Sequence, residues 1–99
     1  MVLFDWDDDK NVINIQKHGI SFKEAETVFY DYDAILVYDS NHSDEEDRFK
    51  IIGLDKSASI LVVVHCYRVL FDNKELEIIR IISARKATKN EEKQYWEGD

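Results

Sequence analysis

Four segments between residues 34 and 83 place the strongest constraint on how this chain can fold. They are rich in isoleucine, valine, phenylalanine and tyrosine, and short polar turns separate them: Ala34 to Tyr38, Arg48 to Leu54, Ile60 to Leu70 and Glu75 to Ser83. β-branched and aromatic residues favour strands, and short connections favour antiparallel neighbours. The pattern therefore predicts a four-strand antiparallel meander.

The residues before this sheet predict a short strand and two helices. Leu3 to Trp6 fits the strand, and the three aspartates from Asp7 to Asp9 suit a helix start, because carboxylates are favourable at the positive end of the helix dipole. Gly19 is expected to end that helix after His18. Ser21-Phe22-Lys23-Glu24 has the spacing of a capping box for the second helix.

A second capping box, Thr88-Lys89-Asn90-Glu91, predicts a last short helix through Tyr95 and Trp96. The expected order is strand, two helices, meander and helix. That order is α+β, and residues 1–99 are expected to form a single domain with one modest core.

Composition excludes several classes of protein. No apolar run approaches the roughly 20 residues of a membrane-spanning helix, and Met1-Val2-Leu3-Phe4 leads into acidic residues and not into a signal peptide. Cys66 is the single cysteine, which rules out an internal disulfide and makes a reducing cytoplasm the expected setting. No CxxC or HExxH spacing occurs, so we expect neither a metal site nor a cofactor.

Charge is spread unevenly along the chain, whose formal net charge is -8. Residues 1–50 carry 13 acidic and 5 basic residues, whereas residues 80–93 carry five basic and two acidic ones. An acidic protein binds nucleic acid poorly in general, but a local basic cluster can still hold a phosphate. Glu24, Glu26 and Asp31 would repel DNA from the second helix, so a helix-turn-helix role is not expected.

Strand alternation gathers polar side chains on one expected sheet face. With a hairpin turn at Asp72-Asn73, His65 would lie opposite Arg80 and Arg68 opposite Glu77. The sheet face that carries Val62, Val64 and Cys66 would then be the face that packs against the core. A matching register for the preceding hairpin places Phe49 opposite Cys66. The other face is then expected to carry Arg48, Lys50, His65, Tyr67 and Arg80, which we take to be the site.

Several of the candidate residues also have a purely structural interpretation. His65 fits a half-buried histidine bonded to backbone, Arg80 fits an ion pair with a carboxylate such as Glu46, and Arg85 and Lys86 fit surface charges near a helix start. The convergence of several cations on one face favours the functional interpretation.

Several segments along the sequence carry a family resemblance. Phe4-Asp5-Trp6-Asp7 and Lys17-His18-Gly19-Ile20-Ser21-Phe22 resemble the first half of the BrnT family of toxins. Three later segments resemble the second half of that family: Glu46-Asp47-Arg48-Phe49, Leu61 to His65 and the run from Arg80 to Thr88. The resemblance follows the family order over nearly the whole chain.

The resemblance implies a compact RelE-like ribonuclease toxin of a bacterial type II toxin–antitoxin system. Its expected partners are an antitoxin with a ribbon-helix-helix DNA-binding domain and RNA, free or on the ribosome. Contact with operator DNA is expected only through the antitoxin, and no membrane is involved.

The chemistry expected from the resemblance is metal-independent attack of a ribose 2′-OH on the adjacent phosphate. Charge stabilisation is expected from Arg80 and Arg48, and acid–base work from His65 and Glu46. Flanking RNA contacts are expected from Lys50, Arg85, Lys86 and Lys17, with Tyr67 stacking on a base.

The main alternative is a catalytically weak or inactive toxin homologue that serves as the antitoxin-binding subunit of an autorepressor complex. Under either reading, the acidic first half predicts basic antitoxin segments against residues 8–31 and acidic ones near Arg80.

Overall fold

The computed structural model of the chain describes residues 2–42, 46–69 and 77–98. Its strands are β1 (Val2–Asp5), β2 (Ile35–Tyr38), β3 (Phe49–Leu54), β4 (Ile60–Val69) and β5 (Glu77–Lys86). Its helices are α1 (Asp8–His18), α2 (Phe22–Glu26), α3 (Lys89–Glu97) and two 3-10 segments, η1 (Thr27–Tyr30) and η2 (Ser40–His42). The expected Asp72-Asn73 turn lies outside the described residues.

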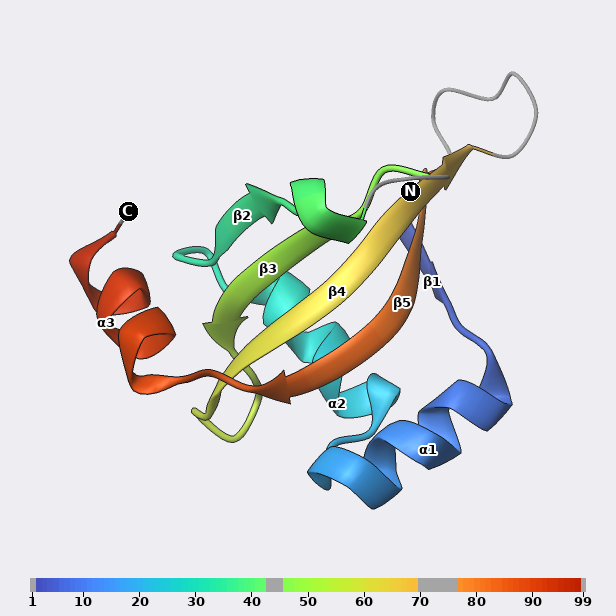
Figure 1. The fold of residues 1–99 in the computed structure, drawn as a ribbon, viewed down its shortest axis with the longest axis horizontal. Coiled ribbons are helices and arrows are strands. Elements are labelled where there is room, and N and C mark those ends of the chain that lie inside the picture. Colours follow the sequence, from blue (N-terminus) through green and yellow to red (C-terminus); the bar gives the residue numbers. More distant parts are fainter. Residues whose placement is uncertain (1, 43–45, 70–76, 99) are drawn as a thin grey trace.

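The five strands form one sheet in the order β1-β5-β4-β3-β2. Strands β2 to β5 are antiparallel neighbours, which confirms the predicted meander, and β1 adds to the edge of β5 in parallel. Helices α1 and α2 lie on one side of this sheet, and α3 follows the end of β5 (Figure 1). The α+β class is therefore confirmed.

Local sequence signals explain where the helices begin and end. The Asp7 carboxylate accepts hydrogen bonds from the amides of Asp9 and Lys10 at 2.9 and 3.2 Å, and Gly19 ends α1 with a φ of 70°. The Ser21 hydroxyl accepts from the amide of Glu24 at 3.0 Å. The reciprocal capping box of Thr88 and Glu91 is complete. These predicted helix starts and the Gly19 stop are confirmed.

Apolar side chains are buried on both faces of the sheet. The larger core packs α2 and η1 against the sheet and includes Phe22, Val28, Leu61, Val63 and Ile81. A smaller core on the opposite face consists of Ile52, Val62 and Tyr95, with Tyr95 contributed by α3. Strand β4 is thus buried from both sides along most of its length.

The predicted strand register is wrong by one residue. Phe49 lies opposite His65 and not Cys66, and His65 lies opposite Ile81 and not Arg80. Arg68 accordingly lies opposite Ile78 and not Glu77, and an irregularity after Val64 shifts the pairing once more. The side of β4 that faces α1 and α2 is therefore that of Leu61, Val63 and His65, the reverse of the expectation.

One buried side chain joins α1 to the free part of the β5 edge. The Asn14 amide donates to the carbonyl oxygens of Ile20 and Ala84, both at 2.9 Å, and its oxygen accepts from the Ala84 amide at 3.1 Å. Asn14 thus satisfies both backbone groups of Ala84 where β1 has ended, much as a neighbouring strand would.

Candidate functional site

Basic side chains gather on the sheet face opposite α1 and α2. Arg80 lies directly across from Cys66, and Lys50 across from Val64. Side chains alternate along a strand, so Arg48 and Arg68 emerge on this same side. We call these four residues, Arg48, Lys50, Arg68 and Arg80, the cationic face.

The spacing of the cationic face suits a phosphodiester. Strands β3 and β5 flank β4, so their side chains start about 10 Å apart, and arginine stems can converge from that distance. Within the described residues no other part of the sheet presents basic residues from three adjacent strands.

Carboxylates at the margins hold two of these arginines. Arg80 Nη1 contacts Asp5 Oδ2 of β1 at 2.6 Å, while its side chain keeps 28% exposure. Arg48 Nε lies 3.8 Å from Glu46 Oε1, and the Glu46 side chain is 43% exposed. Both arginines are therefore oriented by acids that still leave part of the guanidinium accessible to a ligand.

Comparison with known proteins identifies the family of this chain. Residues 6–91 match the family described as the ribonuclease toxin, BrnT, of type II toxin-antitoxin systems. This chain belongs to the BrnT family. It also resembles the crystal structure of the Brucella abortus ribonuclease toxin BrnT, with a TM-score of 0.59, 25% identity and coverage of 90% of this chain and 99% of that one. No curated protein matches the chain.

In this BrnT-family chain, His65 lies on the other side of the sheet from Arg80. The His65 side chain is fully buried, and its ring packs against Phe29, Phe49 and Tyr67, with centroids 4.8, 6.1 and 5.2 Å away. Its Nδ1 lies 3.1 Å from the Val63 carbonyl oxygen, and its Nε2 lies 3.2 Å from the Tyr67 hydroxyl.

Burial lowers the pKa of His65, and the bond to Val63 opposes that effect only in part. A neutral histidine with both ring nitrogens engaged fits a core role. Tyr67 shares this face, so the expectation that His65 and Tyr67 lie beside Arg80 is corrected.

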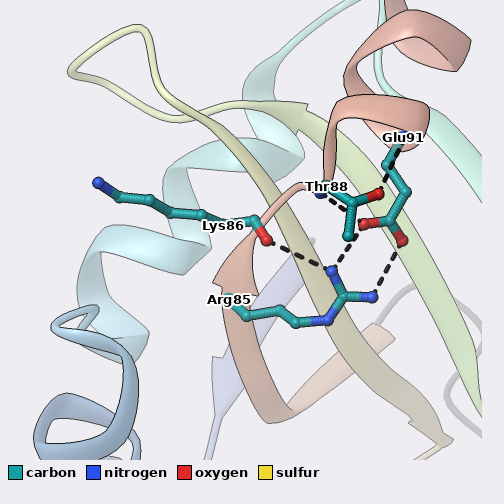
Figure 2. Close-up of polar contacts among 4 residues, drawn as sticks. All are labelled: Arg85, Lys86, Thr88 and Glu91. Atoms are coloured by element: carbon teal, nitrogen blue, oxygen red, sulfur yellow. Dashed lines mark hydrogen bonds and ion pairs between the residues drawn. The ribbon is translucent and has the colours of Figure 1, made fainter.

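Arg85 and Lys86 follow each other on β5 but point in different directions (Figure 2). Two nitrogens of Arg85 contact both carboxylate oxygens of Glu91, at 2.7 and 2.9 Å, and one of the two also donates to the Lys86 carbonyl at 3.3 Å. This pairing lowers the pKa of Glu91 to about 2. Glu91 also accepts from the Thr88 amide at 2.9 Å, so Arg85 is built into the start of α3.

Lys17 lies apart from the cationic face. It lines a surface pocket of about 200 Å³ together with Lys10, His18, Ile82 and Ser83, between α1 and the free edge of β5. Two lysines, a histidine and a hydroxyl make this pocket a second place where an anion can be held.

Sequence reasoning missed two members of the site. Arg68 was expected to pair with Glu77, and Asp5 was not recognised as the partner of Arg80 because β1 had not been placed in the sheet. The one-residue register error accounts for the first omission. In the described ranges no three His, Cys, Asp or Glu side chains come together as a metal site would require, and no helix there is long and apolar enough to cross a membrane.

Proposed function

We propose that this chain is an endoribonuclease toxin that cleaves RNA by attack of a ribose 2′-OH on the adjacent phosphate. The observation that carries the proposal is the cationic face itself: Lys50 on β3, Arg48 just before it and Arg80 on β5 share one face of an otherwise acidic protein, on the two strands that flank β4. Membership of the BrnT family supports it.

The proposed reaction needs charge on the phosphorane oxygens, and Arg80 and Arg48 supply it. A guanidinium fork matches two phosphate oxygens, and acids already hold both arginines in position. The new bond joins the 2′-oxygen to phosphorus, and the bond from phosphorus to the 5′-oxygen breaks.

Proton transfers in this proposal fall to Glu46 and Lys50. Glu46, an exposed carboxylate beside Arg48, takes the 2′-OH proton. Lys50 gives a proton to the leaving 5′-oxygen, because it emerges on the same sheet face, whereas His65 lies on the opposite one. Lys17, in its basic pocket, and Lys86 would hold phosphates farther along the strand.

The test measures growth and bulk RNA integrity after expression of the chain alone is induced in bacteria. Arg80→Ala is expected to abolish growth arrest and RNA loss, since removing one preorganised charge-stabilising group costs on the order of 10²–10³ in rate. Asp5→Ala is the matched comparison, because it breaks the same ion pair but keeps the Arg80 guanidinium in the protein. Arrest that persists in Arg80→Ala would overturn the assignment of Arg80.

A second candidate function is an inactive subunit that binds its antitoxin and helps to repress the operon. The net charge of -8 and the engagement of Arg80 and Arg85 with carboxylates favour it. Unimpaired growth with the parent chain and with Arg80→Ala, at equal expression, would support this function. Under both proposals the partner is a ribbon-helix-helix antitoxin. RNA, free or bound to the ribosome, is a ligand only under the first proposal.

A further inference from the structure

A continuous row of aromatic rings lies on the sheet face opposite the cationic face. Neighbouring ring centroids are 4.8 to 6.2 Å apart, and the row runs through Tyr30, Phe4, Phe29, His65, Tyr67, Phe49 and Tyr38. These rings come from β1, η1, β2, β3 and β4. Segments far apart in the sequence therefore build one aromatic surface.

Three tyrosines bring this row to the solvent. Tyr30 is 72% exposed, Tyr38 50% and Tyr67 37%, whereas His65 within the row is fully buried. We call Tyr30, Tyr38 and Tyr67 the tyrosine patch. Exposed rings held by contacts with neighbouring rings give a rigid surface that loses little conformational entropy when a ligand binds.

Carboxylates lie beside the tyrosine patch. The Tyr38 hydroxyl donates to Asp47 Oδ1 at 3.1 Å. Glu77 is near enough to Tyr67 for its negative charge to add to burial in raising the pKa of that phenol.

The two faces of the sheet thus differ in the ligands they favour. Phosphates are attracted to the cationic face and repelled by Asp47 and Glu77. Aromatic faces beside carboxylates instead attract lysine and especially arginine, through cation–π contacts and Coulomb attraction.

We propose that the tyrosine patch is the docking site for a basic segment of a partner protein, in which arginine or lysine side chains alternate with apolar ones. This inference rests on the proposed toxin function, under which that partner is the antitoxin, and it places the antitoxin contact on the side of the sheet away from the RNA. Tyrosine and arginine are the residue types that most often dominate binding energy at interfaces.

The first experiment measures binding of the purified chain to two short fluorescein-labelled peptides. In one peptide arginine and leucine alternate, and in the other glutamate replaces every arginine. The arginine peptide is expected to bind and the glutamate peptide is not. Tyr30→Ala and Tyr38→Ala are each expected to weaken arginine-peptide binding by roughly 3- to 30-fold, the range of one cation–π contact.

Tyr32→Ala is the matched control, because Tyr32 is fully exposed and outside the aromatic row. Its binding is expected to equal that of the parent chain. Charge reversal provides variants that leave the packed rings intact. Asp47→Lys and Glu77→Lys should weaken binding of the arginine peptide. Glu92→Lys, at an exposed position in α3, changes the net charge by the same amount and should weaken binding less.

Equal loss in the patch variants and in their controls would overturn the proposal, since binding would then follow net charge alone. Failure of the arginine peptide to bind the parent chain at low salt would overturn it as well. A single-stranded RNA oligonucleotide that competes with the arginine peptide for the patch would assign the surface to nucleic acid and would also overturn it.

This outcome can be separated from that of the proposed function. Peptide binding is measured on the purified chain and needs no catalysis. Loss of RNA cleavage in Arg80→Ala with intact peptide binding would support both proposals. If the parent chain binds the peptide but does not cleave RNA, the docking site would be supported and the proposed ribonuclease function would be overturned.

Discussion

The Tyr95 hydroxyl donates a hydrogen bond to Asp31 Oδ2 at 2.6 Å and so joins α3 to the segment that follows η1, 64 residues earlier. The same carboxylate oxygen accepts from the Leu54 amide at 2.8 Å. Burial by itself would raise the pKa of Asp31, but these bonds and one from the Asp33 amide outweigh it and lower that pKa. A single carboxylate thus connects α3, β3 and the turn before β2.

Tyr95→Phe is expected to lower the free energy of unfolding by about 1.5–3 kcal/mol, because it removes a hydrogen bond to a charged group. Burial and Asp31 raise the pKa of Tyr95 to about 12 from 10.0. The stability from this raised pKa is present below pH 10 and is lost as the pH rises toward 12. Urea titrations across this range should show the loss in the parent chain and not in Tyr95→Phe. Tyr32→Phe is the control.

Gly53→Ala is expected to destabilise the fold by about 1–3 kcal/mol through overpacking. A Cβ at Gly53 would lie 2.9 Å from Ala34 Cβ and 3.0 Å from both Val28 Cγ1 and Asp31 Oδ2. Because the new methyl would displace the carboxylate that Tyr95 uses, the effects of Gly53→Ala and Tyr95→Phe should be less than additive. Full additivity in a double-mutant cycle would contradict this coupling.

Glu91→Gln is expected to lower the free energy of unfolding at neutral pH by about 1 kcal/mol. The expected loss is small because the Arg85 side chain is 39% exposed and solvent weakens the ion pair. The bond from Arg85 is the main cause that lowers the pKa of Glu91 from 4.5 to about 2. The parent chain should therefore lose this stability as the pH falls through that interval, and Glu91→Gln should not. Glu92→Gln, an exposed neighbour in α3, should behave as the parent chain does.

His65→Ala is expected to cost about 2–4 kcal/mol of stability, because it leaves a cavity among Phe29, Phe49 and Tyr67. Burial lowers the pKa of His65 from 6.5, so the unfolded chain takes up the proton first and stability falls as the pH drops below about 6.5. Thermal unfolding of His65→Ala measures the loss of stability. His18→Ala is the control, because the His18 side chain is exposed. A fully stable His65→Ala protein without RNA cleavage would instead indicate a catalytic histidine.

Local signals in the sequence were enough to predict most helix and strand positions. Asp7, Gly19, Ser21 and Thr88 act on their own helix ends, through bonds that span two to four residues. The strand segments rich in valine and isoleucine likewise became β2 to β5. Such features need no knowledge of distant neighbours. The family resemblance extended the prediction to a toxin fold, which is confirmed.

The candidate site was predicted only in part, because its composition depended on strand register. Arg48, Lys50 and Arg80 were correctly placed on one face, since any register that buries Phe49 and Ile51 turns Arg48 and Lys50 away from that core. His65 and Tyr67 were assigned to the same face and lie on the other. Alternation could not decide this, because Leu61, Val62, Val63, His65 and Cys66 are all buried.

The sequence by itself determined the order of elements, the helix caps and the presence of a basic cluster in an acidic chain, because each depends on residues close together along the backbone. Only the tertiary structure decided which face of β4 meets α1 and α2, that β1 joins β5 so that Asp5 holds Arg80, and that Arg85 is held by α3. A central strand covered on both faces carries no alternation of polar and apolar residues. Its register is therefore selected by the packing of the helices on either side.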